Sequence, residues 1–177
     1  LSALFLASEG YPVAKHGNRA VSSPTGSADL LEALGYRLDE PPEKTVSRIH
    51  RENFGVLFAP HYHPSMKHAV APRKELAIRT VFNLLGPLSN PARAKSQLIG
   101  VFARETMPIV AHALNKLGVE IGLVVHSEDG LDEISPMAKT HYLLVSDGNV
   151  AEGVIDASEF NLSIDDLSDV QIEDGPD

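Results

Sequence analysis

The sequence predicts an α/β fold with a mostly parallel sheet flanked by helices, and three observations carry that prediction. Short apolar or β-branched runs alternate with segments of helical period, as in chains that build parallel sheets. Residues 119–125 are apolar almost throughout, which is typical of a strand buried on both faces. Residues 146–149 read Ser-Asp-Gly-Asn, which predicts a tight hairpin turn and therefore one antiparallel pair near the end.

The expected elements follow this alternation along the chain. Strands are expected at residues 11–14, 56–59, 97–102, 119–125, 142–145 and 150–155. Helices are expected at residues 28–34, 43–53, 64–77 and 105–117. Gly35 and Gly118 end two of these helices, and Pro41-Pro42 suits the first turn of another. In the last helix we expect one buried face, formed by Ile109, Val110, Ala113, Leu114 and Leu117.

Composition excludes several classes of protein. The chain has 177 residues, 43% of them hydrophobic and 22% charged, which is enough for a globular domain with a core. It contains no Cys, so a disulfide scaffold, a Cys-ligated metal site and a Cys nucleophile are excluded. No apolar run reaches the roughly 18 residues of a membrane helix, and no signal-peptide pattern occurs. We therefore expect a soluble, cytoplasmic protein.

The net charge of -9 is unevenly distributed. Nine acidic residues and no Lys or Arg lie in 152–177, which leaves 15 acids and 15 bases in the remainder. Residues 60–104 carry seven bases and a single acid, Glu75. This basic segment predicts an anionic ligand bound at a defined place, with a solvated basic face as the alternative.

Residues 15–29 form the densest polar segment of the chain. They follow a predicted strand and open a predicted helix, the place where α/β proteins bind ligands. The segment combines two cations and two glycines with several hydroxyl and amide donors, a combination suited to phosphate or pyrophosphate. The alternative is a polar loop in which Ser27 is a plain helix N-cap.

Two further clusters could carry chemistry. Asp132 and Glu133 follow the buried strand at 119–125, and adjacent carboxylates there suit Mg²⁺ if a phosphate site lies beside them; otherwise they form a solvated acidic loop. Arg73 offers a planar fork for a substrate carboxylate, whereas Arg79 fits a buried ion pair equally well. A zinc site would need a group of histidines such as His61, His63 and His68, but packing and capping by His63 is the preferred interpretation.

Four separated motifs together resemble the anthranilate phosphoribosyltransferase family. The first is Lys15-His16-Gly17-Asn18-Arg19 with Ser22-Ser23, followed by Gly26-Ser27-Ala28-Asp29 and residues 31–35. The second is Phe58-Ala59-Pro60 with His63-Pro64 and Met66-Lys67. Residues 79–91 and 129–135 supply the other two, so the resemblance covers about residues 5–160.

The resemblance implies a fold, a reaction and a set of site residues. The fold would be the large phosphoribosyl-binding domain of the nucleoside phosphorylase/phosphoribosyltransferase type, usually in a homodimer. The reaction would be Mg²⁺-dependent transfer of phosphoribose from phosphoribosyl pyrophosphate to the amine of anthranilate, in tryptophan biosynthesis. Phosphoribosyl pyrophosphate would be bound by Lys15, His16, Gly17, Asn18, Arg19, Ala20, Val21, Ser22, Ser23 and Ser27. Anthranilate would be bound by Asn18 and Arg73, and Mg²⁺ by Asp132 and Glu133. No catalytic residue is assigned beyond His16, a weak candidate for accepting a proton.

The sequence also departs from the family pattern. It lacks the family's Gly-Thr-Gly-Gly-Asp and Asn-x-Ser-Thr segments, and Pro24 stands where the family often has a basic residue. We therefore expect a central fragment, inactive alone, with an incomplete α/β domain at residues 1–158 and an acidic connector at 159–177. Two alternatives remain: a nucleoside phosphorylase-like enzyme, and a non-catalytic nucleic-acid-binding relative of the same fold. The acidic tail and the low aromatic content of 6% argue against nucleic acid as the partner.

Overall fold

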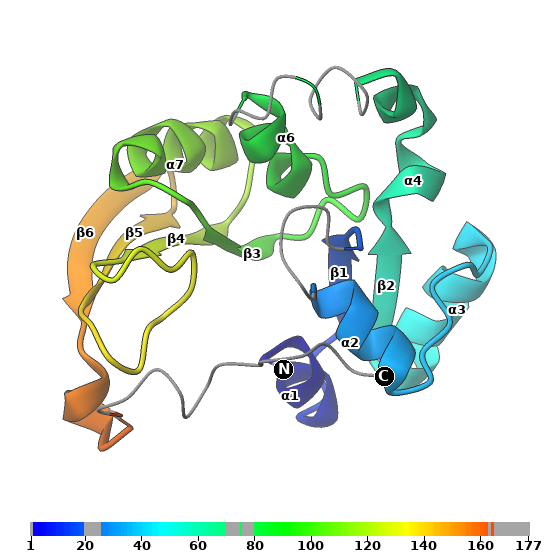
Figure 1. Ribbon diagram of the computed structural model, residues 1–177, viewed down its shortest axis with the longest axis horizontal. Helices are drawn as coiled ribbons and strands as arrows, with labels where there is room; N and C mark the ends of the chain where they lie inside the picture. Colours follow the sequence, from blue (N-terminus) through cyan, green and yellow to red (C-terminus); the bar gives the residue numbers. More distant parts are fainter. Residues whose placement is uncertain (1, 20–25, 70–74, 76–79, 163, 165–177) are drawn as a thin grey trace. The chain divides into compact units, whose positions relative to one another are not determined.

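The computed structural model describes residues 2–19, 26–69, 75, 80–162 and 164. These residues fall into two compact units divided between Ala92 and Arg93, here called the N-terminal unit and the C-terminal unit. Each unit packs helices against strands, which confirms the predicted α/β class (Figure 1). No helix in the described ranges is both long and apolar enough to cross a bilayer.

The N-terminal unit is built on two parallel strands, β1 (Val13–Gly17) and β2 (Phe54–Phe58). Its helical elements are α1 (Ser2–Ser8), α2 (Ser27–Ala33), α3 (Pro42–Glu52), α4 (Ala59–Tyr62), η1 (Pro64–Met66) and α6 (Phe82–Leu88). Every residue of β2 is buried. Its side chains share a core with residues of α1, α2 and the α2–α3 connection: Ala7, Ala28, Leu31 and Leu38.

Local sequence explains where the helices of this unit begin and end. Pro42 occupies the first turn of α3, where its missing N–H costs no hydrogen bond, and Asn53 ends the helix in the left-handed conformation with φ 57°. Gly26 is the N-cap of α2, and its N–H donates to the Asp29 carboxylate at 2.8 Å. Ser27 is therefore the first helical residue and not the cap.

The C-terminal unit contains a four-stranded mixed sheet in the order β3-β4-β5-β6. Its elements are β3 (Ser96–Gly100), η2 (Arg104–Thr106), α7 (Met107–Lys116), β4 (Ile121–Ser127), β5 (Thr140–Ser146), β6 (Asn149–Ile155) and η3 (Ala157–Phe160). Helix α7 connects the parallel pair β3 and β4 and packs on β4 and β5 (Figure 1). Leu114 of α7 is fully buried there, and burial of such a side chain stabilises a fold by about 1.5–3 kcal/mol.

The structure confirms the predicted hairpin and adds a pairing that was not predicted. Asp147 and Gly148 join β5 to β6 with φ values of 49° and 78°, the two positive angles that a tight hairpin turn requires. Strand β5 also pairs antiparallel with β4. The reason is that residues 128–139 form no helix and return the chain as a loop, whereas the crossover of a parallel pair usually contains a helix.

Two expectations about individual elements need correction. Strand β1 extends to Gly17, beyond the expected 11–14, because Lys15, His16 and Gly17 pair with β2. The helix expected over 64–77 is not among them, because its described residues are helical: η1 covers Pro64–Met66, and residues 67–69 and 75 are helical as well. The expected face of the 105–117 helix was wrong for Ile109 and Leu117, which are 61% and 59% exposed. Helix α7 instead buries a set with the same helical spacing: Met107, Val110, Ala111 and Leu114.

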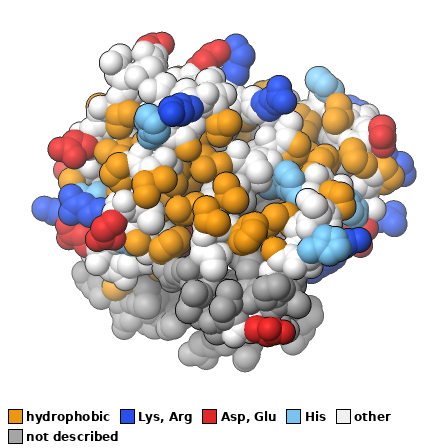
Figure 2. Space-filling model, turned by 90° about the horizontal axis from the view of Figure 1, so that it is seen from above, with side chains coloured by type: hydrophobic (Ala, Val, Ile, Leu, Met, Phe, Trp, Pro, Cys, Tyr) orange, Lys and Arg blue, Asp and Glu red, His pale blue; other side chains and the backbone are white. Residues whose placement is uncertain are grey.

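Large apolar side chains are also exposed on both units. Val81 in the N-terminal unit is 60% exposed, and Ile109 in the C-terminal unit is exposed to a similar degree. Figure 2 shows many hydrophobic side chains on the face seen from above.

Candidate active site

The polar segment that the sequence singles out begins within β1. Lys15, His16 and Gly17 are the last three residues of that strand and pair with Val56, Leu57 and Phe58 of β2. Asn18 and Arg19 follow at once, so the segment lies at the carboxyl end of a parallel strand, where ligand sites form in α/β folds. The structure thus brings the first five residues of the predicted phosphate-binding set together. Ala20, Val21, Ser22 and Ser23 lie outside the described residues, as does Arg73.

Arg19 is anchored by contacts with α2 and β2. Its guanidinium donates two hydrogen bonds to the Glu32 carboxylate, at 2.8 and 2.7 Å, and lies 4.7 Å from the centre of the Phe58 ring. The bidentate hydrogen bond lowers the pKa of Glu32. Arg19 therefore ties the segment after β1 to the helix that follows it.

Asn18 and Asn90 make main-chain contacts at either end of the same region. The Asn18 side-chain oxygen accepts the Arg19 N–H at 2.8 Å, and the residue is otherwise exposed. Asn90, which follows α6, donates to the Ala14 carbonyl of β1 at 3.1 Å. The turn after α6 is thus attached to the strand that carries the polar segment.

His16 is paired with His63. Their Nε2 atoms lie 3.1 Å apart, and the rings meet edge to face with centroids 5.1 Å apart. Burial lowers the pKa of His16, the charge on His63 lowers it further, and a hydrogen bond with the main chain of Gly86 partly opposes both. His16 is consequently held in its neutral form near pH 7.

His61, another histidine of the possible zinc group, has a different neighbour. His61 packs edge-on against Phe58, with ring centroids 5.4 Å apart. Within the described ranges, no three His, Asp or Glu side chains gather as a metal-binding group. His63 contributes no side-chain hydrogen bond to the adjacent helix, so its contact is with His16 and not with a cap.

The carboxylates predicted to bind Mg²⁺ lie on the loop after β4, in the C-terminal unit. Asp132 and Glu133 are both exposed, and neither side chain forms a hydrogen bond or ion pair with a residue that the structure describes. Two adjacent carboxylates fit Mg²⁺, a hard ion that takes few protein oxygens and fills its other positions with water and substrate phosphates. An arrangement of this kind is suited to an ion that arrives with a phosphorylated substrate.

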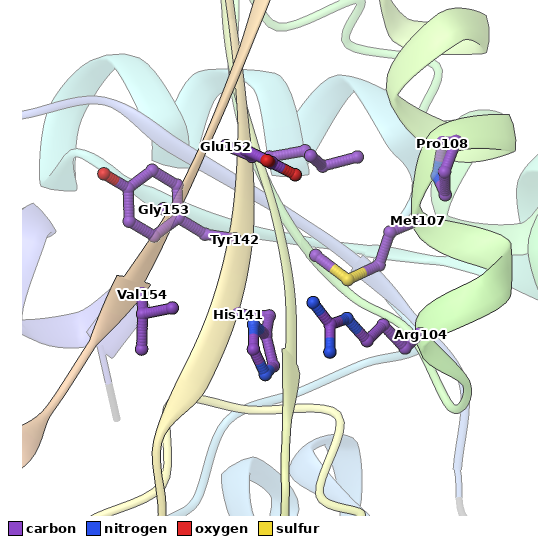
Figure 3. A pocket seen from close by; sticks show the side chains of 9 residues that line it. Arg104, Met107, Pro108, His141, Tyr142, Glu152, Gly153 and Val154 are labelled. Carbon is purple, nitrogen blue, oxygen red and sulfur yellow. The ribbon is translucent and has the colours of Figure 1, made fainter.

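A cavity of about 370 Å³ lies between the start of α7 and strands β5 and β6 (Figure 3). Its lining includes Arg104, Met107, His141 and Glu152. The Tyr142 ring lies on the other side of the strands, against Gly153, where a Cβ would be only 2.4 Å from it. None of the residues predicted to bind substrate or metal lines this cavity, so we do not place the reaction there.

Three residues of the four motifs have contacts in these regions that were not predicted from the sequence. Glu32, Phe58 and His63 contact Arg19 or His16 but are distant from them in sequence. A lone acid on a short helix, or a His before a Pro, has many structural uses, so neither gives a signal by itself. Only their positions after folding reveal the contacts.

Comparison with known proteins places these motifs in a family. A sequence model described as the glycosyl transferase family, a/b domain, matches residues 1–177. The anthranilate phosphoribosyltransferase of Thioalkalivibrio sulfidiphilus is 49% identical over 173 residues, which are 98% of this chain and 51% of that protein.

Solved structures agree with the sequence match. The crystal structure of anthranilate phosphoribosyltransferase from Thermus thermophilus superposes with a TM-score of 0.89 at 44% identity, over 98% of this chain and 51% of that one. The enzyme from Saccharomyces cerevisiae in complex with PRPP and Mg superposes with a TM-score of 0.84 at 33% identity, over 99% of this chain and 48% of that one.

These matches confirm the resemblance on which the sequence prediction rests. The chain spans about half the length of the relatives it matches. The family model itself covers the chain from its first residue to its last. The chain therefore belongs to the glycosyl transferase family, a/b domain.

Proposed function

We propose that a protein containing this chain transfers the phosphoribosyl group of phosphoribosyl pyrophosphate to the amine of anthranilate. The products are N-(5-phosphoribosyl)anthranilate and pyrophosphate, in a step of tryptophan biosynthesis. The observation that carries the proposal is 49% identity to an anthranilate phosphoribosyltransferase over nearly the whole chain. The yeast relative solved with PRPP and Mg supports the donor substrate and the ion.

The reaction is a displacement at the anomeric carbon of the ribose. The bond from that carbon to the pyrophosphate oxygen breaks, and pyrophosphate leaves with the electron pair. The amine nitrogen of anthranilate forms the new bond and then loses a proton. Because positive charge develops on the ribose and negative charge on pyrophosphate, the protein contributes mainly by positioning and electrostatics.

The segment after β1 binds phosphoribosyl pyrophosphate in this proposal. Lys15 supplies a positive charge, and the main chain at Gly17 can approach the ligand closely because it has no side chain. Ala20 to Ser23 and Ser27 complete the set as further donors. Arg19 joins the set through its anchoring contact with Glu32, which holds the segment in place.

Anthranilate is bound in this proposal by Asn18 and Arg73. Asn18 is exposed at the end of β1, and its amide nitrogen can bond to a carboxylate. Arg73 belongs to the basic segment 60–104 and would pair with the same carboxylate through its planar fork. The amine of anthranilate is neutral at pH 7, so no strong base is needed. Neutral His16 is the candidate for accepting the proton after bond formation.

Asp132 and Glu133 would hold Mg²⁺ in this proposal. The bound ion would supply positive charge to the departing pyrophosphate. Residues 1–158 would form the α/β part of the enzyme, and residues 159–177 the acidic connector. We further propose that the enzyme is a cytoplasmic homodimer, which light scattering on the purified protein would test.

The direct test is the loss of anthranilate fluorescence on addition of phosphoribosyl pyrophosphate and Mg²⁺ to the purified protein that contains this chain. We expect consumption that depends on both additions and is abolished in Asp132→Asn. The matched control is a panel of nucleosides with inorganic phosphate, which should not react. Consumption of nucleosides without consumption of anthranilate would assign the chain to the phosphorylase-like alternative.

Arg73→Ala separates the two substrate sites. We expect a higher KM for anthranilate with little change in the KM for phosphoribosyl pyrophosphate, because the lost fork faces a carboxylate in this proposal. Initial rates with each substrate varied in turn provide the measurement. An effect confined to phosphoribosyl pyrophosphate would show that Arg73 belongs to the phosphate site.

A further inference from the structure

The loop between β4 and β5 carries four acidic side chains that differ in their partners. Glu128 lies 2.9 Å from the ring of His141. Asp129 accepts hydrogen bonds from the hydroxyls of Ser127 and Ser135. Asp132 and Glu133 have no such partner in the described part of the chain. The first two carboxylates are therefore engaged within the protein, and the last two are available to a ligand.

Asp129 connects the two ends of the segment that carries Asp132 and Glu133. One carboxylate oxygen accepts from the Ser127 hydroxyl and from the Leu131 N–H, the latter at 3.3 Å. The other accepts from the Ser135 hydroxyl at 2.5 Å. Ser127 is the last residue of β4, and Ser135 lies beyond the two available carboxylates. The Asp129 side chain thus closes the segment into a ring anchored on the sheet.

The hydroxyl of Ser135 requires an acceptor at this place. Ser135 is 1% exposed, and its oxygen already accepts the N–H groups of Met137 and Ala138, at 3.0 and 3.1 Å. Its own N–H donates to the Thr140 hydroxyl, which is fully buried at the start of β5. With both lone pairs of the oxygen used, the hydrogen must be donated, and Asp129 accepts it.

Gly100 provides a second, independent constraint on the same segment. A Cβ at Gly100, the last residue of β3, would lie 1.6 Å from the carbonyl oxygen of Asp132. The main chain of Asp132 therefore rests directly on the end of β3, in space that only a glycine leaves open. Asp132 is thereby fixed by the strand beneath it as well as by the ring that Asp129 closes.

We propose that Asp129 is a positioning residue that holds Asp132 and Glu133 in the arrangement that binds the catalytic divalent ion. Gly100 supports the same segment by allowing the main chain of Asp132 to pack against the end of β3. This inference rests on the proposed function, since it assigns the ion to Asp132 and Glu133. Asp129 acts through these two residues, because its two oxygens already accept three hydrogen bonds from within the loop.

The test compares two variants that remove the same charge from the same loop. In Asp129→Asn the amide offers one acceptor oxygen, so either the Ser135 hydroxyl or the Leu131 N–H loses its acceptor. In Glu128→Gln, the matched control, the changed side chain faces His141 and takes no part in the hydrogen bonds of Asp129, so the ring stays intact. Circular dichroism and thermal unfolding establish that each variant is folded under the assay conditions.

Two readouts are measured on the protein that contains this chain. The first is Mn²⁺ affinity by electron paramagnetic resonance in the presence of pyrophosphate, which needs no turnover. The second is the Mg²⁺ dependence of the initial rate. We expect Asp129→Asn to weaken Mn²⁺ binding by about 10-fold to 100-fold, the usual effect of losing a residue that orients metal ligands. Saturating Mg²⁺ should restore kcat, and Glu128→Gln should change the affinity much less.

Equal weakening in both variants would overturn the inference, because Asp129 would then act only through its charge. Unchanged Mn²⁺ affinity in a folded Asp129→Asn would overturn it as well. If that variant does not fold, Ser127→Ala removes one donor from the ring and should produce a smaller shift in the same direction; no shift counts against the inference. Mn²⁺ binding that responds to Asp129 in a protein that does not consume anthranilate would instead contradict the proposed function alone.

Discussion

The segment after β1 and the loop after β4 both follow a strand of a parallel pair, and both carry groups proposed to bind substrate or metal. The first is held by charge, through the exposed Arg19–Glu32 pair. The second is held by hydroxyl groups that are almost fully buried, at Ser127 and Ser135. An exposed ion pair tolerates displacement and is screened by salt, whereas a buried hydroxyl without a partner is destabilising. We therefore expect salt to weaken the contacts that hold the segment after β1. We expect small side-chain substitutions to destabilise the loop after β4.

Gly100→Ala should have the largest effect on stability, because it disturbs the close contact between β3 and the main chain of Asp132 without changing any charge. The added Cβ would overlap the Asp132 carbonyl oxygen, so the main chain must move. We expect a loss of stability at the upper end of about 1–3 kcal/mol, the usual range for an overpacked site. Urea unfolding followed by circular dichroism measures it. Gly86→Ala, where a Cβ meets nothing within 4 Å, is the control; equal losses would show that the close approach at Gly100 is unimportant.

Asp129→Asn should destabilise the protein by about 1–3 kcal/mol at neutral pH if a buried donor loses its acceptor. Burial raises the pKa of Asp129, but hydrogen bonds from Ser127, Ser135 and Leu131 outweigh it, so the pKa lies below the ordinary 3.8. The unfolded chain therefore binds this proton first on acidification, and the stabilisation is complete above pH 3.8 and is lost as the pH falls below it. Urea unfolding at pH 7 and about pH 3 should show the difference between wild type and variant shrinking in acid; a constant difference would contradict the ring.

The pairing of His16 with His63 should make stability depend on pH in a higher pH range than the Asp129 ring does. Because burial and His63 lower the pKa of His16, the folded state favours neutral imidazole, and stability declines as the pH falls below 6.5. His63→Gln removes one of the two causes, so the pKa of His16 should rise while burial still holds it below the ordinary value. A nuclear magnetic resonance titration of the His16 ring measures this, and an unchanged pKa would argue against electrostatic coupling.

Glu32→Gln should have the smallest effect of the series. The Arg19–Glu32 pair is more than one-third exposed on both sides, so water and salt screen it, and the contact of Arg19 with Phe58 remains. We expect a slight loss of stability at low ionic strength that disappears in about 1 M NaCl, measured by thermal unfolding at both salt concentrations. A large loss independent of salt would place this pair in the same class as the Asp129 ring.

Much of the fold could be predicted because local patterns specify it. The apolar run at 119–125 lies within two residues of β4, and the Asp-Gly turn defines the β5–β6 hairpin. The antiparallel pairing of β4 with β5 was not predictable, since nothing local distinguishes a returning loop from a crossover. The buried face of α7 was misjudged because Met107 and Ile109 fit the helical period equally well. Periodicity indicates a helix but does not set its rotation when apolar residues lie on several faces.

The candidate site, like the fold, could be predicted from the sequence only in part. Residue types with evident chemistry, such as Lys15, Asp132 and Glu133, could be chosen from the sequence. The residues that hold them in place could not, because Ser127, Ser135 and Gly100 belong to types that occur in any loop or strand end. Their significance comes from burial and close approach, which exist only in the folded chain.

The strand order of the C-terminal unit has a kinetic consequence. Strands β4, β5 and β6 follow one another through a loop and a tight turn, whereas β1 must find β2 across the intervening α2 and α3. Chains whose contacts are local fold faster, because less loop entropy is lost before the contacts form. We expect the amides of β4, β5 and β6 to gain protection before those of β1 and β2 in pulse-labelled hydrogen exchange during refolding. The loop that holds Asp132 and Glu133 would then be complete while the segment carrying Lys15 is still forming.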